Sequence, residues 1–168
     1  MGFTEIKPEL LTENPFKLIG KDWMLITAGT PESFNTMTAS WGGMGVLWEK
    51  QVAFCFIRPT RHTFGFMEKA GEFTLSFFPE QHRKALVYCG SRSGRDTDKI
   101  KGTGLVPVKE KNAVYFEEAK LVLVCRKLYF QDINPGHFLD PAIEEMYPEK
   151  DYHRMYAGEI VRCLVKKA

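Results

Sequence analysis

The strand-forming pattern of this chain constrains its fold more than any other feature. Short apolar or alternating runs recur between residues 23 and 165, and most neighbouring runs are separated by only a turn. Such runs indicate β-strands joined as antiparallel hairpins. No strand–helix–strand alternation repeats, so the pattern does not favour a doubly wound parallel sheet. We therefore predict a mainly β protein, an antiparallel barrel with peripheral α-helices.

The individual elements follow from local signals. A turn at residues 29–32 joins strand 23–28 to strand 34–40, and the glycines after Trp41 predict a loop over residues 41–45. Residues 51–57 are apolar on both faces, which predicts a buried strand that carries no chemistry. Helices are expected from Thr60, as N-cap, to residue 70, and over residues 80–88 with Gly90 closing the second. The remaining expected strands are residues 73–78, 105–108, 113–116, 121–131 and 155–165.

Length and composition predict one domain over residues 1–168. Residues 1–20 form an N-terminal arm, expected to pack through Leu10, Leu11, Phe16 and Ile19. A net charge of +2 gives no global field for nucleic acid or a membrane surface. The four cysteines lie more than thirty residues apart, so no metal site is expected. The N-terminus has no apolar targeting segment, which predicts a cytoplasmic protein.

Two polar stretches surround the expected buried strand. Residues 35–41, NTMTASW, combine hydroxyls, strand amides and Trp41, and can satisfy a flat polar ligand as well as form an ordinary edge strand. Residues 58–63, RPTRHT, set Arg58 and Arg61 around hydroxyls at a helix start, where free amides and guanidinium groups bind phosphate. The alternative for this second stretch is a charged strand-to-helix corner.

Two further stretches offer partners to these. Residues 91–99, SRSGRDTDK, are a solvated loop if taken alone, but Arg95 and Lys99 lie about one helical turn apart and can reach the same anion. His153, between two tyrosines, is either structural or part of a cofactor or nicotinamide pocket. No Ser–His–Asp or Cys–His arrangement or carboxylate pair stands out, which favours an enzyme whose cofactor carries the reaction.

As a set, these segments resemble the flavin reductase-like, FMN-binding split-barrel family, particularly its flavoredoxin branch. The resemblance rests on NTMTASW at 35–41, IRPTRHT at 57–63, EFTLSFF at 72–78, SGRDTDK at 93–99 and DYHRMYAGEI at 151–160. It implies a six-stranded Greek-key split barrel, a homodimer, and one FMN per protomer. It also implies that the cofactor-binding residues are Asn35, Thr36, Met37, Thr38, Ala39, Ser40, Trp41, Arg58, Pro59, Arg61, Thr63, Ser91, Ser93, Arg95, Lys99 and His153.

The resemblance implies roles for these residues. Residues 35–41 would line the ring and ribityl chain, while Arg58, Arg61 and Thr63 hold the phosphate side. His153 lies where many flavin reductases carry a Gly-Asp-His motif near the nicotinamide. Here the piece reads Asp-Tyr-His, so both the glycine and the direct Asp-His step are missing.

The expected function is an FMN-dependent oxidoreductase that takes reducing equivalents from NAD(P)H and passes them to flavin, a partner protein or an oxygenase. The alternative is a non-enzymatic FMN electron-transfer protein that docks with an iron–sulfur partner. A third hypothesis is a small barrel for another phosphorylated ligand, such as pyridoxal phosphate.

Overall fold

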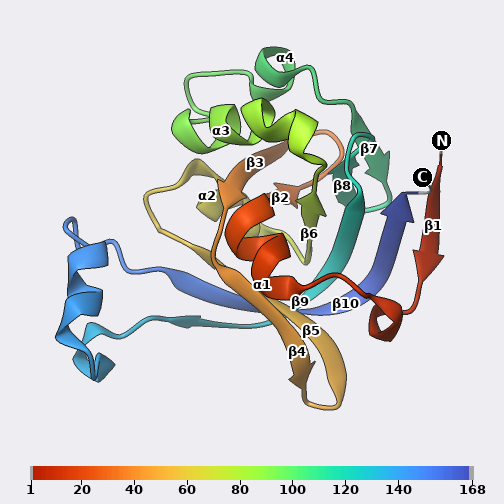
Figure 1. Ribbon diagram of the computed structural model, residues 1–168. Coiled ribbons are helices and arrows are strands. Elements are labelled where there is room, and N and C mark those ends of the chain that lie inside the picture. Colours follow the sequence, from red (N-terminus) through yellow and green to blue (C-terminus); the bar gives the residue numbers. More distant parts are fainter. Residues whose placement is uncertain (1, 167–168) are drawn as a thin grey trace.

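The computed structural model describes residues 2–166, and its main feature is one large antiparallel sheet (Figure 1). The strands of this sheet hydrogen-bond in the order β3-β2-β6-β9-β10-β5-β4, and β1 pairs with β10. Their bounds are β1 Phe3–Ile6, β2 Met24–Gly29, β3 Phe34–Ala39, β4 Gly42–Leu47, β5 Lys50–Ile57, β6 Glu72–Phe77, β9 Leu121–Asp132 and β10 Arg154–Lys166. A separate hairpin joins β7 Pro107–Glu110 to β8 Ala113–Phe116.

The two ends of the strand order are consecutive in the chain. Only Ser40 and Trp41 separate β3 from β4, yet no ladder joins these two strands. The sheet therefore curls until its two end strands, β3 and β4, meet at this short link. The barrel stays open between these two strands, because they form no hydrogen-bonded ladder. This is the split antiparallel barrel that the sequence predicts, with eight strands in the main sheet within residues 2–166.

Two apolar clusters hold the barrel. One fills its interior and includes Met24, Ile26, Phe73, Leu75 and Tyr156, all at most 1% exposed. Burial of this kind contributes roughly 25 cal/mol per Å² of apolar surface. The other cluster lies on the outer face of β2, β6 and β9, beneath the helices. All four cysteines are buried and free, as small core residues.

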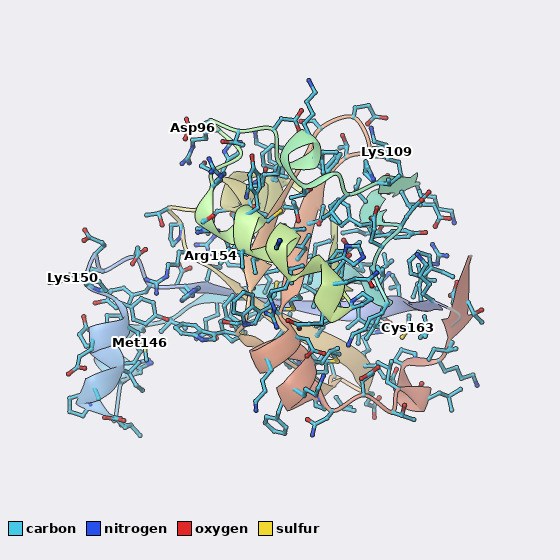
Figure 2. The ribbon with its side chains drawn as sticks, turned by 45° about the horizontal axis from the view of Figure 1, so that its top comes forward. Asp96, Lys109, Met146, Lys150, Arg154 and Cys163 are labelled. Atoms are coloured by element: carbon cyan, nitrogen blue, oxygen red, sulfur yellow. The ribbon has the colours of Figure 1, made fainter. Side chains whose placement is uncertain are left out.

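Short helices surround the sheet (Figure 1). They are η1 Pro8–Leu10, α1 Pro15–Lys17, the π-helix η2 Leu18–Asp22, α2 His62–Lys69, η3 Glu80–His82, α3 Arg83–Ser91, α4 Lys99–Thr103, η4 Pro135–His137 and η5 Pro141–Met146. Helix α3 covers β3 and part of β2, α4 packs against α3, and η4 and η5 form an extension at the far end of β9 and β10. Figure 2 shows Met146 and Lys150 on this extension, far from Asp96 and Lys109. Within residues 2–166, no helix is both long and apolar enough to cross a membrane.

The expected loop over residues 41–45 is wrong, because Gly42–Leu47 is strand β4. It pairs with β5 from Gly42 opposite Cys55 to Leu47 opposite Lys50. Trp48 and Glu49 form the connecting turn with φ values of 52° and 57°. Neither residue type favours that conformation, so the turn gives no sequence signal. At Gly42 an added Cβ would lie 2.8 Å from the Phe54 carbonyl oxygen, so this glycine permits close packing within the sheet.

Three other boundaries differ from expectation. Arg61, not Thr60, occupies the N-cap of α2, because the Thr60 hydroxyl donates instead to Asp151 Oδ2 over 3.2 Å. Helix α3 continues through Gly90, which packs against Thr38. The helix expected over residues 80–88 therefore begins as the 3-10 turn η3 and ends three residues later.

The N-terminal segment packs differently from the prediction. Leu10 and Phe16 are 64% and 87% exposed, so they do not anchor it. Ile19 is buried and Leu11 packs partly against the interior cluster, as predicted. Strand β1, which the sequence analysis missed, adds an anchor by pairing with the end of β10.

Candidate functional site

A polar groove runs along β3 at the split of the barrel. It consists of two adjoining hollows of about 200 and 230 Å³, which share Met37 and Arg61. The first, the aromatic hollow, is lined by Met37, Thr38, Ala39, Ser40, Trp41, Phe56, Arg58, Arg61 and His153. The second, the cationic hollow, is lined by Asn35, Met37, Thr60, Arg61, His62, Thr63, Gly90, Ser91, Arg92, Ser93, Arg95 and Lys99.

Strand β3 and helix α2 are fastened together at the cationic hollow. The Asn35 amide donates to the hydroxyl of Thr63 over 2.8 Å, and both side chains are buried. A Cβ at Gly94 would lie 2.1 Å from Asn35 Oδ1, so only glycine lets the loop after α3 come this close. Three stretches that are far apart in sequence, β3, α2 and the loop after α3, are thereby held around one hollow.

Lys99 brings a buried cation to this hollow. Its side chain is 6% exposed, and its ammonium donates to the carbonyl oxygens of Thr36, over 2.6 Å, and Cys89, over 2.9 Å. Neither acceptor carries a formal charge. Burial, with a smaller contribution from the charge of Arg61, lowers the pKa of Lys99 to about 8. A buried cation without a counter-ion gives this hollow a strong attraction for an anion.

Arg61 stands between the two hollows. Its guanidinium donates to the Gly90 carbonyl over 3.2 Å and makes no ion pair with a carboxylate in the described part of the chain. Burial, and then the charge of Arg58, lowers its pKa. None of the side chains that line the groove is acidic. The unpaired fork of Arg61 is therefore free to bind phosphate or carboxylate in two-point fashion.

Arg58 is held differently, although the sequence places it in the same motif. Its guanidinium pairs with Asp151 Oδ1 at 2.7 Å and donates to the Met146 carbonyl at 2.8 Å. It also lies over the Tyr147 ring, 4.7 Å from the centroid. Most of its donors are thus used to anchor the η4–η5 extension to the barrel, and only part of the side chain borders the aromatic hollow.

His153 is buried in the wall of the aromatic hollow. Its Nδ1 lies 2.8 Å from the Tyr147 hydroxyl, and its ring centroid is 5.0 Å from that of Trp41. Burial and the charge of Arg58 lower the pKa of His153 to about 4, so the imidazole is neutral near pH 7. A neutral ring whose Nδ1 accepts from tyrosine carries its proton on Nε2. No described residue accepts from that nitrogen.

The structure gathers most residues of the sequence motifs into this groove. The side chain of Thr36 is not among them, because its hydroxyl pairs with Thr27 at 2.9 Å and only its carbonyl reaches Lys99. Pro59 borders a neighbouring hollow behind α2 instead. Phe56, which belongs to the strand expected to carry no chemistry, lines the aromatic hollow. Asp98 caps α4 by accepting from the backbone amides of Ile100 and Lys101.

Sequence reasoning missed Phe56, Thr60, His62, Gly90 and Arg92 as groove residues. Thr60 and His62 belong to the RPTRHT motif and could have been included on that ground. The partial exposure of Phe56 follows from β4 being the last strand of the sheet, which no local pattern shows.

Comparison with known proteins settles the family. The family model described as "Flavin reductase like domain" matches residues 17–168, nearly the whole chain. This chain belongs to the flavin reductase-like family. Membership supports a flavin-related oxidoreductase role, and it confirms the resemblance on which the sequence motifs were interpreted. No curated protein matches the sequence.

Solved structures of the family share the fold. A flavoredoxin from Methanosarcina acetivorans is 18% identical with a TM-score of 0.67, over 98% of this chain and 75% of its own. An FMN-binding protein from Thermus thermophilus, with bound p-hydroxybenzaldehyde, is 21% identical with a TM-score of 0.68, over 97% of this chain and 79% of its own. An NADH:FAD oxidoreductase from Streptomyces globisporus, in complex with NAD and FAD fragments, is 15% identical with a TM-score of 0.65, over 86% of this chain and 74% of its own.

Proposed function

We propose that the groove binds FMN and that the protein is an FMN-dependent oxidoreductase reduced by NAD(P)H. One observation carries the proposal. The cationic hollow around Arg61 and Lys99 has no acidic side chain in its lining, and it adjoins the aromatic hollow. A phosphate on a flat, partly apolar ring system needs both. Membership of the flavin reductase-like family supports a flavin as this ligand. The Thermus FMN-binding protein and the Streptomyces NADH:FAD oxidoreductase support its mononucleotide or dinucleotide form.

The donor set fits the phosphate end of such a ligand. Within residues 2–166 Arg61 and Lys99 have no carboxylate partner, and Ser91 and Ser93 add hydroxyls around the same space. Charge-assisted hydrogen bonds to phosphate contribute roughly 1.5–3 kcal/mol each. Pyridoxal phosphate is not favoured, because Lys99, the one buried lysine of residues 2–166, is held by two backbone carbonyls.

The aromatic hollow fits the ring end. Trp41 and Phe56 provide apolar contact, and the backbone of β3 at Thr38–Ala39 lies along the floor. His153 lines this hollow, and in the tautomer whose Nδ1 accepts from the Tyr147 hydroxyl its Nε2 carries a proton that suits a ring oxygen or a nicotinamide amide. When bound, the flavin supplies the hydride acceptor. The residues of this chain bind and orient it, and His153 holds its proton without titrating near neutrality.

A spectrum and an assay test the proposal together. The purified protein mixed with FMN and passed through a desalting column should retain flavin absorbance, and NADH or NADPH should be oxidised in the presence of FMN. Retained flavin with no turnover, but rapid reduction by a ferredoxin-type donor, would support the electron-transfer alternative. Absence of flavin binding would contradict the proposal.

The proposal extends to assembly. The exposed apolar side chains of the η4–η5 extension, including Leu139 and Met146, are available for pairing with a second copy, so we include the homodimer. Light scattering should give twice the chain mass, and a monomer mass with flavin bound would contradict this part alone.

A further inference from the structure

A pair of polar side chains lies at the ring end of the groove, and only one of them borders the groove itself. The Tyr147 hydroxyl is 2.8 Å from His153 Nδ1, and both side chains are buried. His153 lines the aromatic hollow, whereas Tyr147 lines neither hollow of the groove. The imidazole of His153 therefore contacts the groove and the hydroxyl of Tyr147 at the same time.

Two groups beside Tyr147 favour a negative charge on its oxygen. The guanidinium of Arg58 lies over its ring, 4.7 Å from the centroid. Burial raises the pKa of Tyr147, but the charge of Arg58 and a backbone hydrogen bond from His153 act against this rise, while the carboxylate of Asp151 adds to it. A phenol with a cation and an N–H group beside it gives up its proton more readily than burial alone would allow.

His153 needs such a partner in order to give up a proton. With Nδ1 accepting from the Tyr147 hydroxyl, the proton of the neutral imidazole is on Nε2. Loss of that proton alone would leave an imidazolate anion, which is unfavourable in a buried setting. The ring stays neutral when a second proton enters at Nδ1 as the first leaves at Nε2. The Tyr147 hydroxyl is in position to supply it.

We propose that Tyr147 and His153 form a proton relay that delivers a proton to a ligand in the aromatic hollow. The O–H bond of Tyr147 breaks as an Nδ1–H bond forms, and the Nε2–H bond breaks as a ligand oxygen or nitrogen takes that proton. No electrons are exchanged in this step. The imidazole ends as its other neutral tautomer, and the phenolate of Tyr147 lies beside Arg58. Once the ligand has left, Nε2 takes a proton from water in the groove and Nδ1 returns its own to Tyr147.

The relay rests on the proposed function for its purpose. A ring system that receives a hydride from NAD(P)H gains a negative charge, and a positioned proton donor lowers the energy of that state. Tyr147 acts through His153 and touches no ligand, so it is a positioning residue. Its effect is therefore expected both in the imidazole and in the reaction.

The tautomer of His153 is tested first, in ligand-free protein. Two-bond ¹H–¹⁵N spectra of ring-labelled protein distinguish a protonated from an unprotonated imidazole nitrogen, and His153→Gln assigns the signal. His153 should carry its proton on Nε2, and Tyr147→Phe, which loses only the hydroxyl, should give a mixture of both tautomers. Tyr152→Phe is the matched control, because the Tyr152 hydroxyl donates to Glu144 and not to His153. Thermal unfolding checks that every variant is folded.

The proton transfer is tested by stopped-flow reduction of FMN-loaded protein with NADH and NADPH, in H₂O and in D₂O. Since a positioned proton donor contributes roughly 10²–10⁴-fold, Tyr147→Phe should slow the reduction by at least about tenfold. The solvent isotope effect of the unmodified protein should fall toward one in Tyr147→Phe and persist in Tyr152→Phe. Because Tyr147 acts only through His153, the double variant Tyr147→Phe/His153→Gln should be no slower than His153→Gln.

Three results would overturn the relay and leave the proposed function standing. They are a proton on Nδ1 in the ligand-free protein, an unchanged rate and solvent isotope effect in Tyr147→Phe, and additive effects of Tyr147→Phe and His153→Gln. If no flavin is retained, or retained flavin is not reduced by NAD(P)H, the proposed function fails. The relay, which serves that hydride transfer, then fails with it.

Discussion

The ammonium of Lys99 donates to the backbone carbonyl of Thr36 over 2.6 Å. This bond connects the start of α4 to the outer edge of β3, and it places a positive charge beneath the floor of the groove. Because the second acceptor, the carbonyl of Cys89, is also uncharged, the protein itself does not neutralise this charge. An anionic ligand can neutralise it.

Lys99 should make flavin binding pH-dependent. Its pKa is lowered to about 8, so its ammonium loses its proton as pH rises from 7 to 9 and the groove loses a positive charge. FMN affinity should therefore fall over this interval, by up to about tenfold. Fluorescence titration at several pH values measures the effect.

Two variants isolate the contribution of Lys99. Lys99→Met should weaken FMN binding at pH 7 and remove the pH step. Lys101→Met, on the same helix but with an 87% exposed side chain, should change neither. Identical pH profiles for Lys99→Met and the unmodified protein would contradict the assignment.

Burial, and then the charge of Arg58, should keep the imidazole of His153 neutral. With its pKa lowered to about 4, His153 should show no titration between pH 5 and 8 in an NMR spectrum of ring-labelled protein. Arg58→Gln removes a charge that lowers the pKa of His153, so the pKa should rise in this variant although the burial of the ring remains. A midpoint near 6.5 in the unmodified protein would contradict this account.

Substitutions of Arg58 and Arg61 should have different effects, although one sequence motif contains both residues. Arg58→Ala removes the ion pair with Asp151 and the bond to Met146, which costs about 1–3 kcal/mol in a partly buried setting. Hydrogen exchange should therefore accelerate in the η4–η5 extension of this variant. In Arg61→Ala the extension should exchange normally. Equal exchange in the two variants would contradict the anchoring role.

Gly158 should tolerate no side chain. A Cβ there would lie 2.6 Å from Phe73 Cζ and 2.8 Å from Cys125 Cβ, inside the barrel. Gly158→Ala should lower the free energy of unfolding by about 1–3 kcal/mol, the usual cost of overpacking. Gly45→Ala, on strand β4 with open space around it, is the control in chemical denaturation. Equal denaturation midpoints would contradict this packing.

The sequence predicts those strands in which apolar residues alternate with polar ones or form a continuous run. Strands β2, β3, β6 and β9 appear close to their expected residues, because burial on the barrel side imposes alternation or continuous apolar runs. Strand β4 could not be predicted, since its glycines resemble a loop and its turn uses Trp48 and Glu49 with positive φ. Strand β1 is too short and too polar to stand out, and it forms because the end of β10 offers a free edge.

The candidate site also has parts that the sequence predicts and parts that it does not. The cationic motifs around Arg61 and Lys99 are visible in the sequence because charged and hydroxyl residues are concentrated in two short stretches, 58–63 and 91–99. The use of Arg58 as an anchor is not visible, since Asp151 and Met146 lie about ninety residues further along the chain. The hollow behind α2 could not be predicted either, because it forms where the β2–β3 turn lies beside α2.

The central claim is that Arg61 holds the phosphate of a bound flavin, and a comparison of FMN with riboflavin tests it most directly. These ligands differ only in the phosphate. Calorimetric titration should show FMN binding at least about tenfold more tightly than riboflavin. Arg61→Ala should lose most of that preference, and Lys111→Ala, in an exposed turn, should keep it. Equal FMN dissociation constants for the two variants would contradict the account.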